Sequence, residues 1–167
     1  MRLVLALVLG MLALSCANPF APKLNDNPND HASILGDQRT IEGVFQNFRQ
    51  AYLFKDTTIY GQLLGSNFIF IYKNYVKGVD EFWGRDDDMR TTYAFFQNAQ
   101  RFDLVWNSII AADGDSLHLT LTRNFNLTVT FAAYDIEYAD GYANITLERQ
   151  QQSDNWKITR WRDESNY

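Results

Sequence analysis

The chain has 167 residues and a formal net charge of −5, with 46% hydrophobic and 15% aromatic residues. No basic patch interrupts this acidic composition, and nucleic-acid-binding proteins depend on clustered Lys and Arg, so nucleic acid is disfavoured as a partner. The aromatic content suits either a large core or an apolar cavity, and composition does not separate the two.

Residues 1–15 have the layout of a secretory signal peptide. Met1-Arg2 supplies a positive charge, residues 3–14 form an almost unbroken apolar run, and the small Ser15 precedes Cys16. The run is too short for a transmembrane helix, which needs about 20 apolar residues. We therefore expect export and cleavage rather than a membrane span.

A signal that ends on cysteine resembles the lipobox of bacterial lipoproteins. The resemblance implies that Cys16 is acylated, becomes the first residue of the mature chain and anchors it in a membrane of the cell envelope. The usual lipobox has Leu two residues before the small residue, whereas Ala13-Leu14 fills the two preceding places here. Ala17, rather than an aspartate, follows the cysteine, which implies the outer membrane, facing the periplasm or the cell surface. The alternative is an ordinary signal peptide cut nearby, with an unrelated cysteine.

Residues 16–36 are predicted to be the lipidated cysteine and a flexible tether. All three prolines of the chain lie there, at positions 19, 22 and 28, among many Asn and Asp residues. Such a stretch cannot bury apolar surface and favours extended, solvated backbone. The remaining residues 37–167 contain no proline and are enough for one domain with a buried core.

The domain is predicted to begin with two helices and a strand. Residues 37–52 carry an apolar stripe at helical spacing, which indicates an amphipathic helix with one buried face. Asp56 can cap a short helix at residues 57–64, and Gly65 can end it. The strand at residues 67–72 is apolar on both faces, so we expect it to be covered on both sides.

Residues 76–99 are predicted to contain a turn and then a helix that starts at the three aspartates of residues 86–88. Such a run could suggest a metal site, but no histidine or second carboxylate cluster stands at ligand spacing beside it. Acidic residues are favoured at a helix N-terminus by its partial positive charge, and we interpret the run in this way. Met89, Tyr93 and Phe96 then face inward.

Beyond residue 100 the hydrophobic period changes to two, which indicates strands. The predicted strands cover residues 101–110, 117–131, 143–149 and 156–164, with turns at Asp113-Gly114, Asp140-Gly141 and residues 153–155. A straight 15-residue strand would span about 50 Å, more than the roughly 35 Å expected for a globule of this size. We therefore expect the second of these strands to bend sharply or break at Arg123-Asn124.

Helices, one strand, a helix and then a long antiparallel sheet give an α+β order. Within it, three segments resemble the nuclear transport factor 2-like superfamily, which includes ketosteroid isomerase, scytalone dehydratase and polyketide cyclases. They are AYLFKDTTIYGQLLGSNFIFIY, WGRDDDM and NWKITRWRDES. The resemblance covers about residues 38–165. It implies N-terminal helices packed on a strongly curved, mainly antiparallel sheet that forms a cone with a cavity.

Each predicted element has residues that face inward, and we expect the following ones to meet in the space between the helices and the sheet. They are Phe48, Tyr52, Tyr72, Tyr93, Phe96, Trp106 and Leu119. Enzymes of the superfamily place an acid or base inside the cone. His118 and Asp103 alternate with apolar residues and point outward, which leaves Asp80, Glu81 and Asp163 as candidate catalytic residues. None of the three stands out as a general base, and no cofactor signature or metal-ligand pattern occurs.

We expect a non-catalytic module that binds a small apolar ligand or an envelope protein. The alternative is a small hydrolyase or isomerase of the ketosteroid isomerase or polyketide cyclase kind, which would use the cavity. A buried carboxylate facing an open cavity, with a tyrosine in reach, favours the enzyme, whereas a cavity filled by Phe and Trp favours the interaction module. Many relatives dimerise through the sheet face, so a homodimer is a further expectation, although the Thr-rich face here gives no sign of it.

Overall fold

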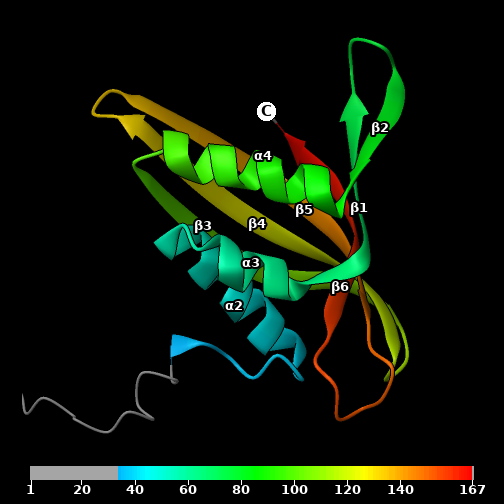
Figure 1. The fold of residues 1–167 in the computed structure, drawn as a ribbon. Coiled ribbons are helices and arrows are strands. Elements are labelled where there is room, and N and C mark those ends of the chain that lie inside the picture. The colour runs from blue at the N-terminus through cyan, green and yellow to red at the C-terminus, as the bar shows by residue number, and fades with distance from the viewer. Residues whose placement is uncertain (1–33, 167) are drawn as a thin grey trace, which may run out of the picture. The chain divides into compact units, whose positions relative to one another are not determined.

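The computed structural model describes residues 34–166 (Figure 1). The predicted signal peptide, Cys16 and residues 17–33 of the predicted tether lie outside the described residues. The folded unit begins at Ile34. Gly36 bonds the side chain of Asn47 through its N–H at 2.6 Å and through its carbonyl at 3.0 Å. The tether prediction therefore extends too far, because residues 34–36 belong to the folded unit.

In the part of the chain that the structure describes, three α-helices precede or interrupt the strands. Helix α2 (Ile41–Phe54) is capped by Thr40, whose hydroxyl accepts from the Gly43 N–H at 3.0 Å, and it ends where Lys55 adopts a left-handed conformation. Helix α3 (Thr57–Leu63) is capped by Asp56, as predicted. Helix α4 (Arg85–Asn98) begins with the aspartate run, also as predicted.

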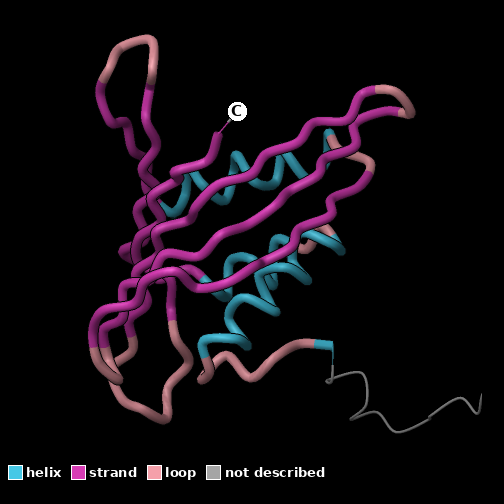
Figure 2. The backbone as a smooth tube through the Cα atoms, turned by 180° about the vertical axis from the view of Figure 1, so that it is seen from behind, coloured by secondary structure: helices cyan, strands magenta, loops and turns pink. Residues whose placement is uncertain are grey.

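Six strands form one sheet in the order β2-β1-β6-β5-β4-β3. Their bounds are β1 Leu64–Asn74, β2 Val79–Gly84, β3 Arg101–Gly114, β4 His118–Ala132, β5 Asp135–Glu148 and β6 Lys157–Asn166. All neighbours are antiparallel except β1 and β6. The sheet curls around the three helices, which all lie on its concave face (Figures 1 and 2). The α+β architecture with helices packed on a curved, mainly antiparallel sheet is therefore confirmed.

Two turn predictions and one burial prediction are wrong. Residues 79–84 form β2 rather than a turn, and their largely exposed side chains leave no apolar face for the sequence to show. Asp140-Gly141 lies inside β5, where continuous pairing with β4 overrides the local turn preference of an Asp-Gly pair. Strand β1 is not covered on both sides, because Ile69 is 42% exposed.

Strand β4 does not break at Arg123-Asn124. It pairs with β5 without interruption from His118 to Thr130 and follows the curvature of the sheet (Figure 1). The irregularity lies instead on β3, between Trp106 and Ala111, opposite Arg123. Arg123 points inward and is buried, with its guanidinium 4.5 Å from the Phe45 ring centroid and bonded to Glu42 at 3.1 Å.

Strand β6 contains a bulge that decides which side chains face the helices. Ile158 pairs with Leu147 and Arg160 with Thr146, so Thr159 is an extra residue on β6. After the bulge, Trp161 lies opposite Ile145 and Asp163 opposite Ala143. Because the buried side chains of β5 mark the core face, Trp161 and Asp163 lie on that face too.

One core fills the space between the helices and the base of the sheet. Its largest buried side chains are aromatic and come from every layer: Phe45, Phe48, Tyr60, Phe68, Phe96 and Phe102. They meet mostly edge to face, for example Phe96 and Phe102 at 5.3 Å, which is a favoured aromatic geometry. Among the described residues, no helix is both long and apolar enough to cross a membrane.

Candidate ligand cavity

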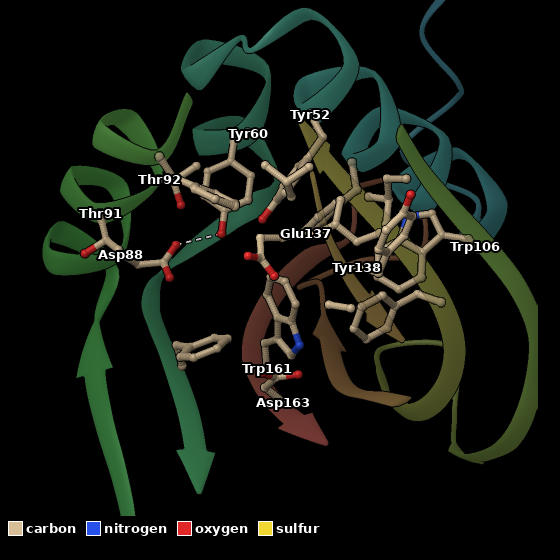
Figure 3. Close-up of a pocket in the computed structure, with 18 of the residues that line it drawn as sticks. Tyr52, Tyr60, Asp88, Thr91, Thr92, Trp106, Glu137, Tyr138, Trp161 and Asp163 are labelled. Atoms are coloured by element: carbon tan, nitrogen blue, oxygen red, sulfur yellow. Dashed lines mark hydrogen bonds between the residues drawn. The ribbon is translucent and has the colours of Figure 1, made fainter. Parts of the chain in front are cut away.

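A cavity of about 530 Å³ opens between the three helices and the concave face of the sheet (Figure 3). More than half of the residues that line it are aromatic: Phe48, Tyr52, Tyr60, Phe70, Trp83, Phe95, Trp106, Phe125, Phe131, Tyr138 and Trp161. The space is therefore not filled by the aromatic side chains that surround it. Its volume lies within the range of small-molecule sites, roughly 300–1,000 Å³.

Aromatic rings meet at steep angles along one side of the cavity. The Trp161 ring lies 5.2 Å from the Phe48 ring at 75° and 5.2 Å from the Phe70 ring at 82°. Phe70 also stacks on Trp83 at 4.7 Å. Rings held in contact like this have few alternative rotamers, so this side of the cavity is a preformed apolar wall.

Asp88 is a buried carboxylate in the cavity wall. It is 4% exposed, its Oδ2 accepts from the Tyr60 hydroxyl at 2.7 Å, and its Oδ1 accepts from the Trp83 indole N–H at 2.9 Å. Burial raises the pKa of Asp88, and the hydrogen bonds from Trp83 and Tyr60 oppose that rise. Figure 3 shows Asp88 and Tyr60 side by side at the cavity, joined by this hydrogen bond.

Asp88 was not among the predicted inward residues, because the helical stripe predicted for this helix lies one residue away from the observed one. In α4 the buried residues are Asp88, Thr92 and Phe96, which are spaced by four. The expectation that Tyr93 faces inward is wrong, since Tyr93 is 56% exposed. Counting back from Phe96 in steps of four leads to Thr92 and then to Asp88. Asp88 therefore belongs to the inward-facing residues, from which the sequence prediction had left it out.

Two further carboxylates line the cavity near its opening. Glu137 lies on β5 opposite Val129, and Asp163 lies on β6 opposite Ala143. Figure 3 shows Glu137 directed toward the space between Tyr60 and Trp161, with Asp163 next to Trp161. The β6 bulge gives Asp163 its inward position, and a regular alternation from Ile158 would have turned it outward.

Two tryptophans beside the cavity carry unused donors. The indole N–H groups of Trp106 and Trp161 are buried, and the structure pairs neither with any acceptor in residues 34–166. An unpaired buried donor is costly, by about 1–3 kcal/mol. A ligand that brings an acceptor to either indole would recover part of that free energy.

The other predicted site residues divide between core, cavity and surface. Phe48, Tyr52 and Trp106 line the cavity. Phe96 is fully buried and Leu119 is partly buried against the core, and neither lines the cavity. Tyr72 is half-buried, and its hydroxyl donates to Glu81 at 2.5 Å on the β1–β2 hairpin rather than into the cavity.

Asp80 and Glu81 are poorly suited to act as bases. Asp80 is bonded to Arg162 at 2.8 Å, which lowers its pKa. Hydrogen bonds to Glu81, the strongest from Lys77 and the next from Tyr72, lower the pKa of Glu81 to about 2. Neither residue lines the cavity, whereas Asp163, the third candidate, does. In the described part of the chain, no group of three or more His, Cys, Asp or Glu side chains is placed to hold a metal ion.

Neither a family model nor a curated protein matches the sequence, but solved structures match the fold. A conserved protein from Planctomyces limnophilus has a TM-score of 0.67 at 12% identity, over 81% of this chain and 98% of that one. A candidate scytalone dehydratase from Novosphingobium aromaticivorans has a TM-score of 0.66 at 12% sequence identity, over 77% of this chain and 83% of that one. A candidate dehydratase of the nuclear transport factor 2-like family from Streptomyces avermitilis has a TM-score of 0.59 at 11% sequence identity, over 81% of this chain and 96% of that one.

These similarities extend over most of the described residues and define the class of fold. The chain has a nuclear transport factor 2-like fold, as the sequence resemblance implies. At identities of 11–12% the similarity shows the architecture of the fold, and it does not show an activity.

Proposed function

We propose that this domain binds a small, largely apolar molecule in its cone cavity. The observation that carries the proposal is an open volume of about 530 Å³ inside an aromatic wall. Side chains of this kind usually collapse to fill a core, so a volume that stays open beside them is typical of a ligand site. The two unpaired indole donors favour a ligand with at least one acceptor atom.

The sequence of residues 1–33 supports a location at the cell envelope. The signal-like start and Cys16 favour a lipid anchor, and the Pro- and Asn-rich stretch that follows favours a tether between anchor and domain. A tethered binding domain would hold its ligand close to the membrane, which suits an apolar molecule that passes through the envelope.

A titration with the neutral fluorescent probe N-phenyl-1-naphthylamine tests binding in the cavity. Ala139 lines the cavity, so Ala139→Trp should fill part of it and weaken probe binding at least about tenfold. Ala112 is exposed on β3 and does not line the cavity, so Ala112→Trp is the matched control and should bind like the wild type. Absence of saturable binding, or equal binding by both variants, would reject the proposal.

A second candidate function is proton transfer in an isomerase or lyase, and Asp88 is the observation that favours it. A buried carboxyl with a raised pKa is a better base near neutral pH than an ordinary aspartate. Each of its oxygens keeps a second lone pair, so the carboxylate could take a proton from carbon next to a carbonyl and return it elsewhere. Tyr60 and Trp83 would hold it in position.

Turnover separates this candidate from binding alone. An enzyme of this kind should convert a cyclic β,γ-unsaturated ketone, and Asp88→Asn should reduce kcat by at least about 100-fold while probe binding stays intact. Unchanged turnover in Asp88→Asn, or none in the wild type, would leave binding as the function.

A further inference from the structure

The cavity has an uneven charge composition. Three carboxylates line it, from Asp88, Glu137 and Asp163, while Lys, Arg and His are absent from the described residues of its lining. The three come from α4, β5 and β6 respectively, so they surround the aromatic space from different elements (Figure 3).

Two arginines near the cavity bond carboxylates that lie outside its lining. Arg162 lies between Trp161 and Asp163 on β6, alternates onto the other face of the sheet and bonds Asp80 at 2.8 Å. Arg123 bonds Glu42 at 3.1 Å and does not line the cavity. Asp88 accepts hydrogen bonds from two neutral groups, the phenol of Tyr60 and the indole of Trp83. Its charge is therefore oriented by these bonds but not neutralised by them.

We infer that the ligand of this cavity is an organic cation, namely an ammonium or quaternary amine attached to an apolar body. This inference rests on the proposed binding function and specifies the class of ligand. An ammonium group is attracted to the faces of Trp, Tyr and Phe rings, and the attraction is stronger where water is excluded. Carboxylates around a partly dry space add an attraction of the same sign.

The same charges disfavour the opposite class of ligand. A carboxylate or sulfonate that entered the cavity would meet three acidic groups, of which Asp88 is buried, and like charges repel most strongly where water is excluded. Fatty acids and other anionic amphiphiles are therefore poor candidates, although their apolar bodies would suit the wall. The predicted order of affinity is cation, then neutral molecule, then anion.

Three ligands that share a benzyl group test this order on the full-length chain. Benzyltrimethylammonium is the cation, neopentylbenzene is its neutral carbon isostere, and phenylacetate is the anion. Fluorescence of the cavity tryptophans and calorimetry would follow binding. We expect the cation to bind at least about tenfold more tightly than the isostere and phenylacetate not to saturate.

Charge-removing variants assign the effect to the cavity. The double variant Glu137→Gln/Asp163→Asn should lose about 3- to 30-fold in affinity for the cation and keep its affinity for the isostere. Asp135 lies on the same strand as Glu137, is exposed and does not line the cavity, so Asp135→Asn is the control and should change neither. Circular dichroism would establish that each variant is folded.

The outcomes separate this inference from the function on which it rests. Equal binding of the cation and the isostere would overturn the ligand class and leave apolar binding in place. Tight binding of the cation that the double variant does not weaken would overturn its assignment to this cavity. If none of the three ligands binds and the neutral probe does not bind either, both the inference and the proposed function fail.

Discussion

Asp88 joins three elements of the fold through one side chain. The carboxylate belongs to α4 and accepts hydrogen bonds from Tyr60 of α3 and Trp83 of β2. Sequence reasoning assigned it to the helix start, and it does lie in the first turn. The run of aspartates hid the fact that its last member faces inward, while Asp86 and Asp87 remain exposed.

The buried position of Asp88 predicts a pH-dependent stability. Because folding raises the pKa of this carboxyl above its ordinary value of 3.8, the folded state binds more protons than the unfolded state between the two pKa values. The stabilising contribution of Asp88 to the free energy of unfolding is therefore fully present below pH 3.8, and it is lost as the pH rises through the pKa of Asp88 in the folded state. Urea unfolding from pH 3.5 to 7 should show wild type losing stability relative to Asp88→Asn as the pH increases.

The comparison with Asp88→Asn removes the effect of the other carboxylates, since they titrate in both proteins. A difference in unfolding free energy that stays constant over this range would contradict the raised pKa.

Arg123 is a second charged residue whose direction is seen only in the structure. The sequence predicts a bend or break of the strand at this residue, whereas in the structure the strand continues and the Arg123 charge faces inward, bonded to Glu42 and lying over the Phe45 ring.

Helix α4 shows how far an element can be predicted from its sequence. Its extent follows from the acidic start and the helical spacing, but few of its residues are apolar, so the buried stripe is only weakly marked. The stripe was therefore set through Tyr93 instead of Thr92. An error of one position rotates a helix by about 100°, enough to exchange an exposed side chain for a buried one.

A matched pair of substitutions tests the observed face of α4. Phe96 is fully buried and Tyr93 is 56% exposed. Phe96→Ala should lower the free energy of unfolding by about 3–5 kcal/mol, because it leaves a cavity in the core. Tyr93→Ala should change it by less than about 1 kcal/mol. Equal losses measured by urea unfolding would contradict this orientation.

Strand β6 shows the limit of alternation rules. Neither a glycine nor a proline marks the bulge at Thr159, so nothing local predicts that the pattern shifts by one residue there. The shift brings Trp161 and Asp163 to the cavity, while Trp156 stays at the buried base of the strand, with the Arg149 guanidinium 4.1 Å from its ring centroid.

Trp156 should be one of the most sensitive positions for stability. It is 3% exposed, so Trp156→Ala should lower the free energy of unfolding by about 3–5 kcal/mol. Thermal and urea denaturation would measure the loss. Arg160, which is exposed on the same strand, provides the control, and Arg160→Ala should cost less than about 0.5 kcal/mol. A loss below about 1 kcal/mol for Trp156→Ala would remove this strand end from the core.

At the scale of the whole molecule, the order of elements was enough to predict the α+β class, and the resemblance to the nuclear transport factor 2-like superfamily implied the curved sheet. The open cavity was not predictable, because the same aromatic residues serve a filled core and a hollow one. Strand β2 was missed since its exposed side chains carry no apolar alternation. The Asp-Gly pair at 140–141 misled because pairing across a long hairpin outweighs local turn chemistry.

The proposed envelope location has a separate test, at Cys16. Cys16→Ala should move the protein from the membrane fraction to a soluble or unprocessed form, because the acyl chains would have no thiol to carry them. Labelling cells with a radioactive fatty acid and fractionating them would measure this. A wild-type protein that takes up no label would refute the anchor and leave the cavity unaffected.

The central claim, that a small molecule occupies the cavity, is tested most directly by the indole signals of the four tryptophans. Trp83, Trp106 and Trp161 line the cavity, while Trp156 is buried away from it and serves as an internal control. Titration of the full-length chain with N-phenyl-1-naphthylamine, followed by nuclear magnetic resonance of the indole N–H groups, should shift the three cavity signals and leave that of Trp156 in place. A titration that moves none of the three, or moves Trp156 alone, would contradict the claim.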